Sequence, residues 1–345
     1  MMMTNSKECA VLDVRKGSLC ICCGDVGKIY LKHPDFPVMF KCTSCGLYFV
    51  DPQAFANETE HTYGKDLNDY TEEEKKHFKK IFSEVIATSD SGGNMYSDFG
   101  ISQQQMEKEI FASVDTLIKQ YRKITKETVW TILDVGCATG FLLNVIRCNY
   151  PSVIISGVEP SPDSCAKAQA LYGIKLFQGT MNTFCAEEKS YDVITIMGNL
   201  QLHADPFLTL RKCRRILKEK GLLIFQMKNP SSLARVFTIL LSKLPILSRW
   251  RITKLAIERG FSCMRYALGK DDLRRMTEEL GLDVLEITTL PPRMLAFGNT
   301  RRGHRRGLIG LAWQILDRID QWRDQQAWIQ VCACRSEYSE LRNRT

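Results

Sequence analysis

The chain of 345 residues lacks any apolar run long enough to cross a membrane. Its longest apolar stretches, such as 236–241, fall far short of the roughly 20 residues that a spanning helix needs. The opening residues, 1–7, are polar and show no charged segment followed by an apolar signal core. We therefore expect a cytoplasmic protein that is neither exported nor inserted in a membrane.

The cysteine pattern lacks the form of a disulfide framework, although the sequence contains 14 cysteines. They are scattered through apparent core and loops alike, which suits a reducing compartment. The formal net charge of +8 is mild for this length. It admits an anionic partner, such as a nucleotide-linked substrate, RNA or a lipid surface, as well as a slightly basic surface without such a partner.

A glycine turn after a buried strand is the most informative stretch of the chain. The apolar run up to Asp134 predicts a parallel strand, and Gly136 and Gly140 allow a sharp turn before a helix. The turn matches neither the dinucleotide fingerprint nor the phosphate-binding loop. The next apolar strand, 153–158, ends in Glu159, and a carboxylate at this place can accept both hydroxyls of a ribose. Together these residues predict a nucleoside site without phosphates.

These motifs resemble those of the class I S-adenosylmethionine-dependent methyltransferases. Residues 133–136 with Gly140 look like the first motif of that family, and 157–161 look like the second. Residues 191–196 are similar to its fourth strand, and 205–225 to the helix and fifth strand that follow. The resemblance implies S-adenosylmethionine as the cofactor, bound by Asp134, Gly136, Cys137, Ala138, Gly140, Glu159, Pro160, Gly179, Thr180, Met197 and Gly198.

The same resemblance implies an α/β fold with a Rossmann-like sheet of seven strands and helices on both faces. Residues 271–280 predict a helix, 282–287 a sixth strand and 327–333 a seventh. In the family, the seventh strand runs antiparallel between the fifth and the sixth.

Two Cys-x-x-Cys-Gly knuckles near the start of the chain form the second strong signal. Cys20 and Cys23 make the first knuckle, and Cys42 and Cys45 make the second. Two such pairs supply the four thiolates of a closed tetrahedral zinc site, which is structural and not catalytic. We expect a zinc ribbon, because some fifty residues with little core need a metal to stay folded.

A zinc ribbon before this domain resembles a bacterial group of methyltransferases with an N-terminal zinc-binding domain, often associated with sugar and natural-product pathways. Residues 46–52 and the tyrosine-containing stretch 63–70 look like that group. We expect a zinc ribbon in 1–52, a linker and helical cap in 53–128, and the methyltransferase domain in 129–345.

His203 is the candidate catalytic residue, because it lies just past the fourth strand and could remove a proton from an acceptor. Relatives often carry Leu-Glu-His there, two residues before Asp-Pro. Counting back from Asp205 places Gln201 and Leu202 at the Glu-His positions and His203 one place later. A histidine at the start of a helix or at the rim of the site is the alternative.

Two apolar and basic segments lie later in the domain. An insertion at about 230–270 should form a lid over the acceptor pocket, and an amphipathic helix is expected at about 303–325. Either segment could pack on the domain or lie on a membrane surface, and the helix could also bind phosphate. Sugar C-methyltransferases of the group usually show a Glu-His pair in the lid, but this chain has no histidine between 204 and 303.

The sequence therefore predicts a methyltransferase that acts on a small molecule, sugar or glycan precursor, with O- or N-methylation favoured over C-methylation. RNA methylation is the first alternative, because a zinc knuckle and positive charge suit it, although no Asn/Asp-Pro-Pro-Tyr-like motif is present. The second alternative is a scaffold that keeps the fold without turnover. The sequence does not reveal the acceptor or the oligomeric state.

Overall fold

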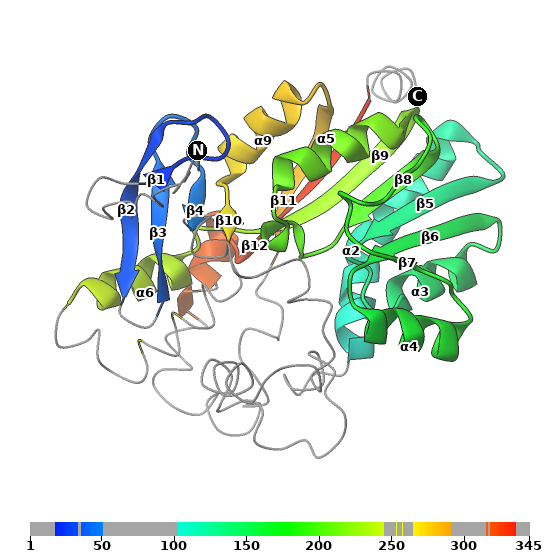
Figure 1. Ribbon diagram of the computed structural model, residues 1–345, viewed down its shortest axis with the longest axis horizontal. Helices are drawn as coiled ribbons and strands as arrows, with labels where there is room; N and C mark the ends of the chain where they lie inside the picture. Colours follow the sequence, from blue (N-terminus) through cyan, green and yellow to red (C-terminus); the bar gives the residue numbers. More distant parts are fainter. Residues whose placement is uncertain are drawn as a thin grey trace, which may run out of the picture.

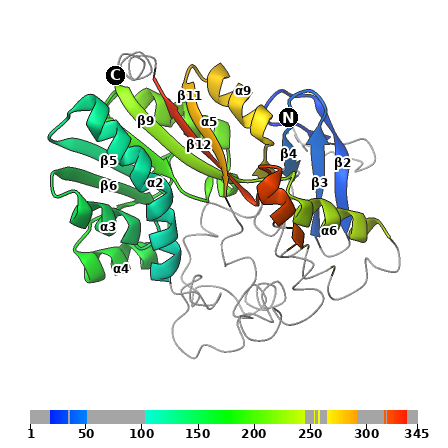
Figure 2. The same ribbon diagram turned by 180° about the vertical axis from the view of Figure 1, so that it is seen from behind.

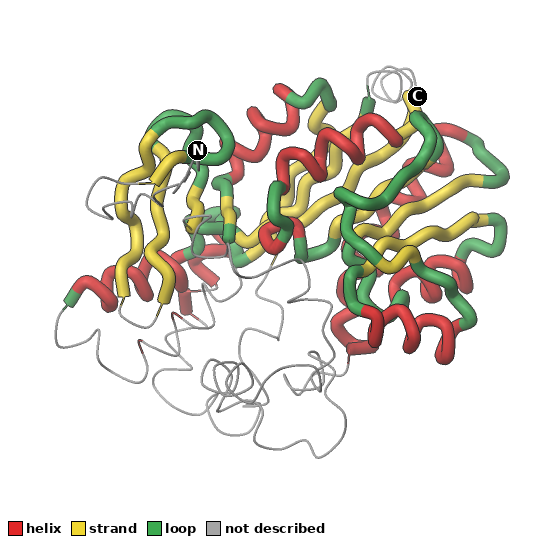
Figure 3. The backbone as a smooth tube through the Cα atoms, viewed as in Figure 1, coloured by secondary structure: helices red, strands yellow, loops and turns green. Residues whose placement is uncertain are grey.

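The computed structural model describes residues 18–33, 36–50, 103–244, 253, 257, 265–290, 315–316 and 318–335. Two β-sheets organise these residues, a large one of seven strands and a small one of five (Figure 1). Figure 3 shows them as two separate groups of strands with helices around them. Within these parts of the chain, no helix is both long enough and apolar enough to cross a membrane.

The large sheet has the predicted number of strands and the predicted antiparallel seventh strand. Six strands run in the same direction, and β12 alone pairs antiparallel with both of its neighbours, β9 and β11. The order across the sheet is β11 (Asp283–Leu290), β12 (Trp328–Cys334), β9 (Leu217–Lys228), β8 (Tyr191–Ile196), β5 (Trp130–Val135), β6 (Val153–Glu159) and β7 (Phe177–Gln178). The predicted α/β fold is therefore confirmed.

Helices cover both faces of this sheet because its strands are apolar on both sides. Ile132 of β5 packs with α2 (Gln103–Thr125), α3 (Phe141–Asn149) and α4 (Pro162–Tyr172) on one face. Its neighbour Leu133 points to the other face, where it packs with α5 (Pro206–Ile216) and α9 (Lys270–Glu279). Consecutive residues of β8 and β9 alternate in the same way, so the sheet separates two apolar cores.

Local sequence explains where the helices begin. The side chain of Ser161 accepts a hydrogen bond from the Ser164 amide and caps α4. Asp205 caps α5 in the same way, by accepting from the Leu208 amide at 2.8 Å. A proline follows each cap, at a position where its missing N–H costs no helical hydrogen bond.

The small sheet contains the cysteine knuckles and one strand from far along the chain. Its order is β1 (Ser18–Leu19), β2 (Val26–His33), β3 (Phe36–Cys42), β4 (Tyr48–Val50) and β10 (Tyr266–Ala267). The expected lid at about 230–270 supplies β10 and also α6 (Leu233–Lys243). Ile239 of α6 packs with Leu31 and Met39 of the small sheet, and Figure 2 shows α6 crossing the ends of β2 and β3. The described parts of this insertion therefore lie against the small sheet.

The small sheet also packs on the large domain. Phe40, Leu47 and Phe49 share one apolar core with residues of the large sheet and of α9. The backbone N–H of Val50 donates to the carbonyl of Arg265 at 2.9 Å, and the N–H of Arg265 donates to the carbonyl of Gln201 at 3.2 Å. A path of backbone hydrogen bonds thus joins β4 to the turn that follows β8.

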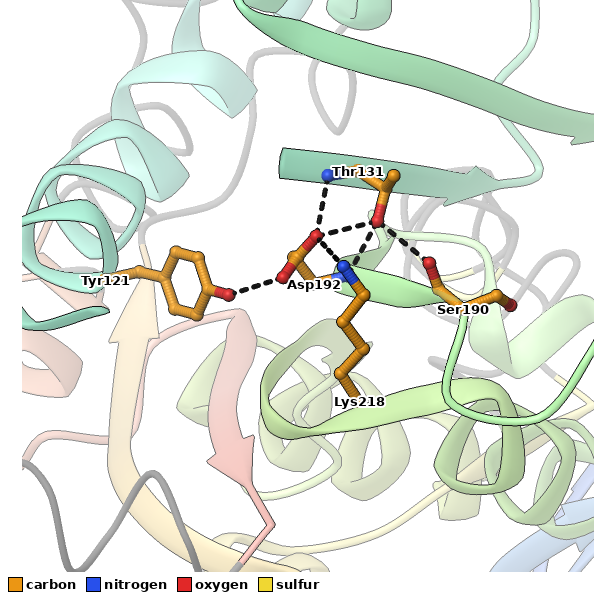
Figure 4. Close-up of polar contacts among 5 residues, drawn as sticks. All are labelled: Tyr121, Thr131, Ser190, Asp192 and Lys218. Atoms are coloured by element: carbon orange, nitrogen blue, oxygen red, sulfur yellow. Dashed lines mark hydrogen bonds and ion pairs between the residues drawn. The ribbon is translucent and has the colours of Figure 1, made fainter. Parts of the chain in front are cut away.

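A buried polar cluster lies at the amino ends of the strands (Figure 4). The carboxylate of Asp192 accepts hydrogen bonds from the Tyr121 hydroxyl at 2.8 Å and from the Thr131 N–H and hydroxyl, each at 2.8 Å. The Lys218 ammonium lies 2.6 Å from the same carboxylate. The cluster joins α2, β5, β8 and β9, so it fixes a helix to the edge of the sheet opposite the glycine turn.

The expected amphipathic helix at about 303–325 lies mostly outside the described residues. Residues 315–316 and 318–322 are helical. Asp320 of this helix accepts a hydrogen bond from the Leu233 N–H at 2.7 Å, which fixes the helix beside the start of α6. The expected linker and cap at 53–128 are described only from residue 103, where α2 packs on the sheet beside α3.

Candidate functional site

The predicted cofactor residues meet at the carboxyl edge of the large sheet. The chain leaves β5 toward β6 and β7 on one side, and β8 and β9 lie on the other side. The order therefore reverses between β5 and β8, and open α/β sheets bind ligands at this kind of position. Asp134 and Glu159 lie at the ends of β5 and β6, and Met197 and Gly198 come directly after β8.

The glycine turn has the backbone conformation that its sequence predicts. Gly136 and Gly140 both have a φ angle of 71°. Ala138, between them, also has a positive φ of 49°, which is uncommon for a residue with a side chain. The Gly136 N–H donates to the Val158 carbonyl at 2.7 Å, so the turn is fixed against the end of β6.

Cys137 contributes its backbone to the turn, because its side chain points into the core. The thiol is buried, and a Cβ added at Gly157 would lie 2.6 Å from its sulfur. Gly157 therefore leaves the space that the thiol fills.

Glu159 is held in place by two backbone amides. One carboxylate oxygen accepts from the Ala138 N–H at 2.8 Å, and the other accepts from the Ser161 N–H at 2.9 Å. Burial raises the pKa of Glu159, while both amide hydrogen bonds oppose the rise. A carboxylate has about four acceptor positions, so each oxygen keeps capacity for a ligand hydroxyl. Pro160 lies between Glu159 and Ser161 and carries no N–H.

Asp134 lies deep in the same edge. Its carboxylate accepts a hydrogen bond from the Thr195 hydroxyl at 2.7 Å. Burial raises the pKa of Asp134 to about 7, and the negative charge of Glu159 adds to the rise while the Thr195 hydrogen bond opposes it. Asp134 is therefore partly protonated near pH 7, and a bound cation would favour its charged form.

The remaining predicted cofactor residues flank these acids. The N–H of Gly179 donates to the Glu159 carbonyl at 3.0 Å, which places Gly179 and Thr180 beside the end of β6. Gly198 has a φ of 80°, and its carbonyl accepts from the Gln201 amide at 2.7 Å.

Asn199 and Thr195 are polar residues of the site that the sequence analysis missed. The Asn199 side-chain nitrogen donates to the carbonyls of Val135 and Gly136, each at 2.9 Å. A signal was available, because both residues are polar and lie at or just beyond the carboxyl end of an apolar strand.

His203 lies next to Asn199 and is partly exposed. Its Nε2 is 3.3 Å from Asn199 Oδ1, and its Nδ1 is 3.0 Å from Thr209 Oγ1. Burial lowers the pKa of His203 to about 4, and the positive charge of Arg265 adds to this effect. The imidazole is therefore neutral near pH 7.

The four predicted zinc ligands converge in the small sheet. The sulfurs of Cys20, Cys23, Cys42 and Cys45 all lie within 4.8 Å of one another. Cys20 and Cys45 are 3.5 Å apart at sulfur, as are Cys23 and Cys42. These separations suit a tetrahedral site, because two thiolates about 2.3 Å from one zinc ion lie just under 4 Å apart.

Comparison with known proteins agrees with the geometry of the large sheet. Residues 132–221 match a family described as methyltransferase domain. This segment begins in β5, contains the glycine turn and ends in β9. This stretch of the large sheet is therefore similar to a methyltransferase domain.

Curated relatives are similar over the same region. The chain is 28% identical over 123 residues to a malonyl-[acyl-carrier protein] O-methyltransferase of Halalkalibacterium halodurans, which covers 34% of this chain and 45% of the relative. It is 31% identical over 114 residues to a ubiquinone biosynthesis O-methyltransferase of Vibrio campbellii, and the match covers 31% of this chain and 48% of the relative. The chain thus spans about half the length of these relatives.

Solved structures are similar at lower identity. The plantazolicin methyltransferase BpumL in complex with SAH is 17% identical, with a TM-score of 0.47, over 76% of this chain and 97% of that one. A SAM-dependent methyltransferase from Archaeoglobus fulgidus is 15% identical, with a TM-score of 0.42, over 66% of this chain and 93% of that one.

Proposed function

We propose that this chain is an S-adenosylmethionine-dependent methyltransferase. The observation that carries the proposal is the Glu159 carboxylate, which the Ala138 and Ser161 amides hold at the end of β6. Fixed in this way, it can accept hydrogen bonds from a ribose without losing its own partners. The match of residues 132–221 to a methyltransferase domain supports the same activity.

The described residues fit this cofactor. Glu159 would hold the ribose, and the turn from Gly136 to Gly140 would approach the ligand without large side chains. A cationic sulfonium bound near Asp134 would favour the charged form of this carboxyl, whose pKa burial raises to about 7. The cofactor supplies a methyl group already activated by that sulfonium, so the protein chiefly has to position the acceptor and exclude water.

We propose a small-molecule acceptor, such as a sugar, a glycan precursor or a related metabolite, that is methylated on oxygen or nitrogen. Two curated relatives are named as O-methyltransferases, for malonyl-[acyl-carrier protein] and in ubiquinone biosynthesis. A hydroxyl or a protonated amine must lose a proton during transfer. The C-methylation motif of the sugar enzymes is absent from the sequence, so oxygen and nitrogen acceptors are favoured.

Calorimetric titration with S-adenosylmethionine and with its demethylated product tests the proposal. We expect both to bind one site per chain. Absence of binding by either ligand would refute the proposal and favour a scaffold without turnover. Retention of RNA that falls steeply with salt would instead favour the RNA methyltransferase alternative.

We propose that Cys20, Cys23, Cys42 and Cys45 bind one structural zinc ion. The support is their convergence within 4.8 Å in a small sheet. Four sulfur ligands leave no open coordination position, so the metal would hold the two knuckles together and take no part in the reaction.

We also propose peripheral contact with a membrane through α6 and the helical residues 315–316 and 318–322. Large apolar side chains are exposed on these helices or directly after α6, namely Phe237, Leu240, Leu244, Ile315, Ile319 and Trp322. Trp322 is 87% exposed, which is unusual for the largest apolar side chain. Lys243 and Arg318 are exposed on these helices and Arg323 is exposed in the turn that follows, and all three would favour anionic lipid.

A further inference from the structure

The Asn199 amide has only one orientation that satisfies its neighbours. Its Nδ2 lies 2.9 Å from two carbonyl oxygens, those of Val135 and Gly136. Carbonyl oxygens only accept, so the nitrogen must face the glycine turn and Oδ1 must face away from it. A Cβ at Gly136 would lie 2.1 Å from this nitrogen, so the turn and the amide fit only because residue 136 is glycine.

This orientation decides where the proton of His203 lies. Asn199 Oδ1 can only accept, and it lies 3.3 Å from the Nε2 of His203. The proton of the neutral imidazole is therefore on Nε2, and the lone pair is on Nδ1. Nδ1 lies 3.0 Å from the Thr209 hydroxyl, whose single proton can be donated to it or to the Asp205 carbonyl at 3.1 Å. Both ring nitrogens are thus occupied by protein groups, and neither offers a lone pair to an acceptor.

Thr209 connects this pair to a rigid element. It lies in the first turn of α5, whose amino end is capped by Asp205. Thr209 is 2% exposed, so its hydroxyl is held within the protein. A continuous series of side-chain contacts therefore runs from α5 through His203 and Asn199 to the Gly136 carbonyl.

We infer that His203 is a positioning residue, which fixes the cofactor-binding turn through Asn199 and does not remove a proton from the acceptor. The inference rests on the proposed function, because it assigns the turn to S-adenosylmethionine. The Asn199 amide holds two backbone carbonyls through contacts within the protein, which would give the cofactor a preformed site. The expected catalytic role of His203 is replaced by a role in cofactor affinity.

The test is calorimetric binding of S-adenosylhomocysteine, which needs no methyl acceptor. His203→Ala removes the donor to Asn199, and we expect the dissociation constant to rise about threefold to tenfold, the usual effect of one lost hydrogen bond. His203→Gln places a side-chain N–H at a similar distance from Cβ, so we expect affinity within about twofold of wild type. Asn199→Ala should weaken binding as well. The loss of binding free energy in the double variant should be smaller than the sum of the losses in the two single variants.

Tyr121→Phe is the control, because it weakens the fold at the opposite edge of the sheet and leaves the turn untouched. It should bind the product as the wild type does, which separates loss of stability from loss of positioning. Unaltered affinity in His203→Ala overturns the inference, and so does His203→Gln binding as weakly as His203→Ala. If wild-type protein binds no product, the proposed function fails. If the wild type binds the product and all variants bind it with the same affinity, the positioning role of His203 fails but the proposed function stands.

Discussion

The hydroxyl of Tyr121 donates a 2.8 Å hydrogen bond to the buried carboxylate of Asp192, 71 positions further along the chain. The bond joins α2 to the amino end of β8. The proposed cofactor residues lie at the carboxyl ends of the strands, so the two edges of the sheet have different roles. Groups that stabilise the fold gather at one edge, and groups suited to bind a ligand gather at the other.

Asp192→Asn should destabilise the protein by about 2 kcal/mol. The amide cannot accept from all the donors that face this carboxylate, and hydrogen bonds to a charged group contribute about 1.5–3 kcal/mol. Tyr121→Phe removes one of these donors and should cost about 1 kcal/mol. Urea unfolding monitored by circular dichroism measures both changes. An Asn variant as stable as wild type would show that the cluster contributes nothing.

The contribution of Asp192 should also depend on pH. Burial alone would raise the pKa of Asp192, but the hydrogen bonds from Lys218, Thr131 and Tyr121 outweigh burial and hold the pKa below its usual value. A lowered pKa stabilises the fold above the unfolded pKa of about 4, and this stabilisation is lost as the pH falls through the folded value. The stability difference between wild type and Asp192→Asn should therefore shrink with acidification. A difference that stays constant would contradict the assignment.

Glu159→Ala should weaken binding of S-adenosylmethionine and of its product by at least about tenfold, because the ribose would lose hydrogen bonds to a charged acceptor. Glu159→Gln keeps one oxygen and should lose less. Glu188→Ala is a matched control, since Glu188 is an exposed acid between β7 and β8. Calorimetry compares the three variants. Wild-type affinity in the alanine variant would remove the main support for the proposed cofactor.

Elemental analysis should find about one zinc ion per chain. Cys42→Ser removes one of four ligands and should lower the zinc content to well below one. Cys22→Ser serves as the control, because Cys22 lies in the first knuckle, between Cys20 and Cys23, but is exposed and outside the four-sulfur cluster. A Cys42 variant with full zinc content would show that the metal binds elsewhere or not at all.

We expect the protein to sediment together with vesicles that contain anionic phospholipid. Trp322→Ala should weaken this partitioning roughly tenfold, because burial of one large apolar side chain contributes about 1.5–3 kcal/mol. Leu171→Ala is the control, since Leu171 is 63% exposed on α4, away from this surface. If neither neutral nor anionic vesicles bind the protein, the membrane contact is wrong, and equal losses in both variants would show nonspecific adsorption.

Local sequence was sufficient to predict several strands of the large sheet, and the family resemblance supplied their number. The strands β5, β6 and β8 are short apolar runs, and the glycine turn at 136–140 requires backbone angles that glycine favours. The antiparallel seventh strand came from the family resemblance, and the structure confirms it.

Contacts between distant residues were not predictable in this way. Tyr266 and Ala267 form a strand too short to recognise, and it exists because β4 offers a free edge. The pairing of His203 with Asn199 depends on side-chain directions after β8, which no periodic pattern encodes. Asp192 lay within a recognised strand motif, but its role became visible only with Tyr121 placed beside it.

The backbone hydrogen bonds that join Val50 to Arg265 and Arg265 to Gln201 affect how a truncated form of the protein would behave. A fragment that starts at residue 103 would lose the partner of β10, leave the Arg265 carbonyl without its donor and uncover the apolar surface that Phe49 and Leu47 now cover. Such a truncated piece would tend to aggregate, so the cysteine-bearing sheet is part of the same folded unit as the large sheet and not a detachable module.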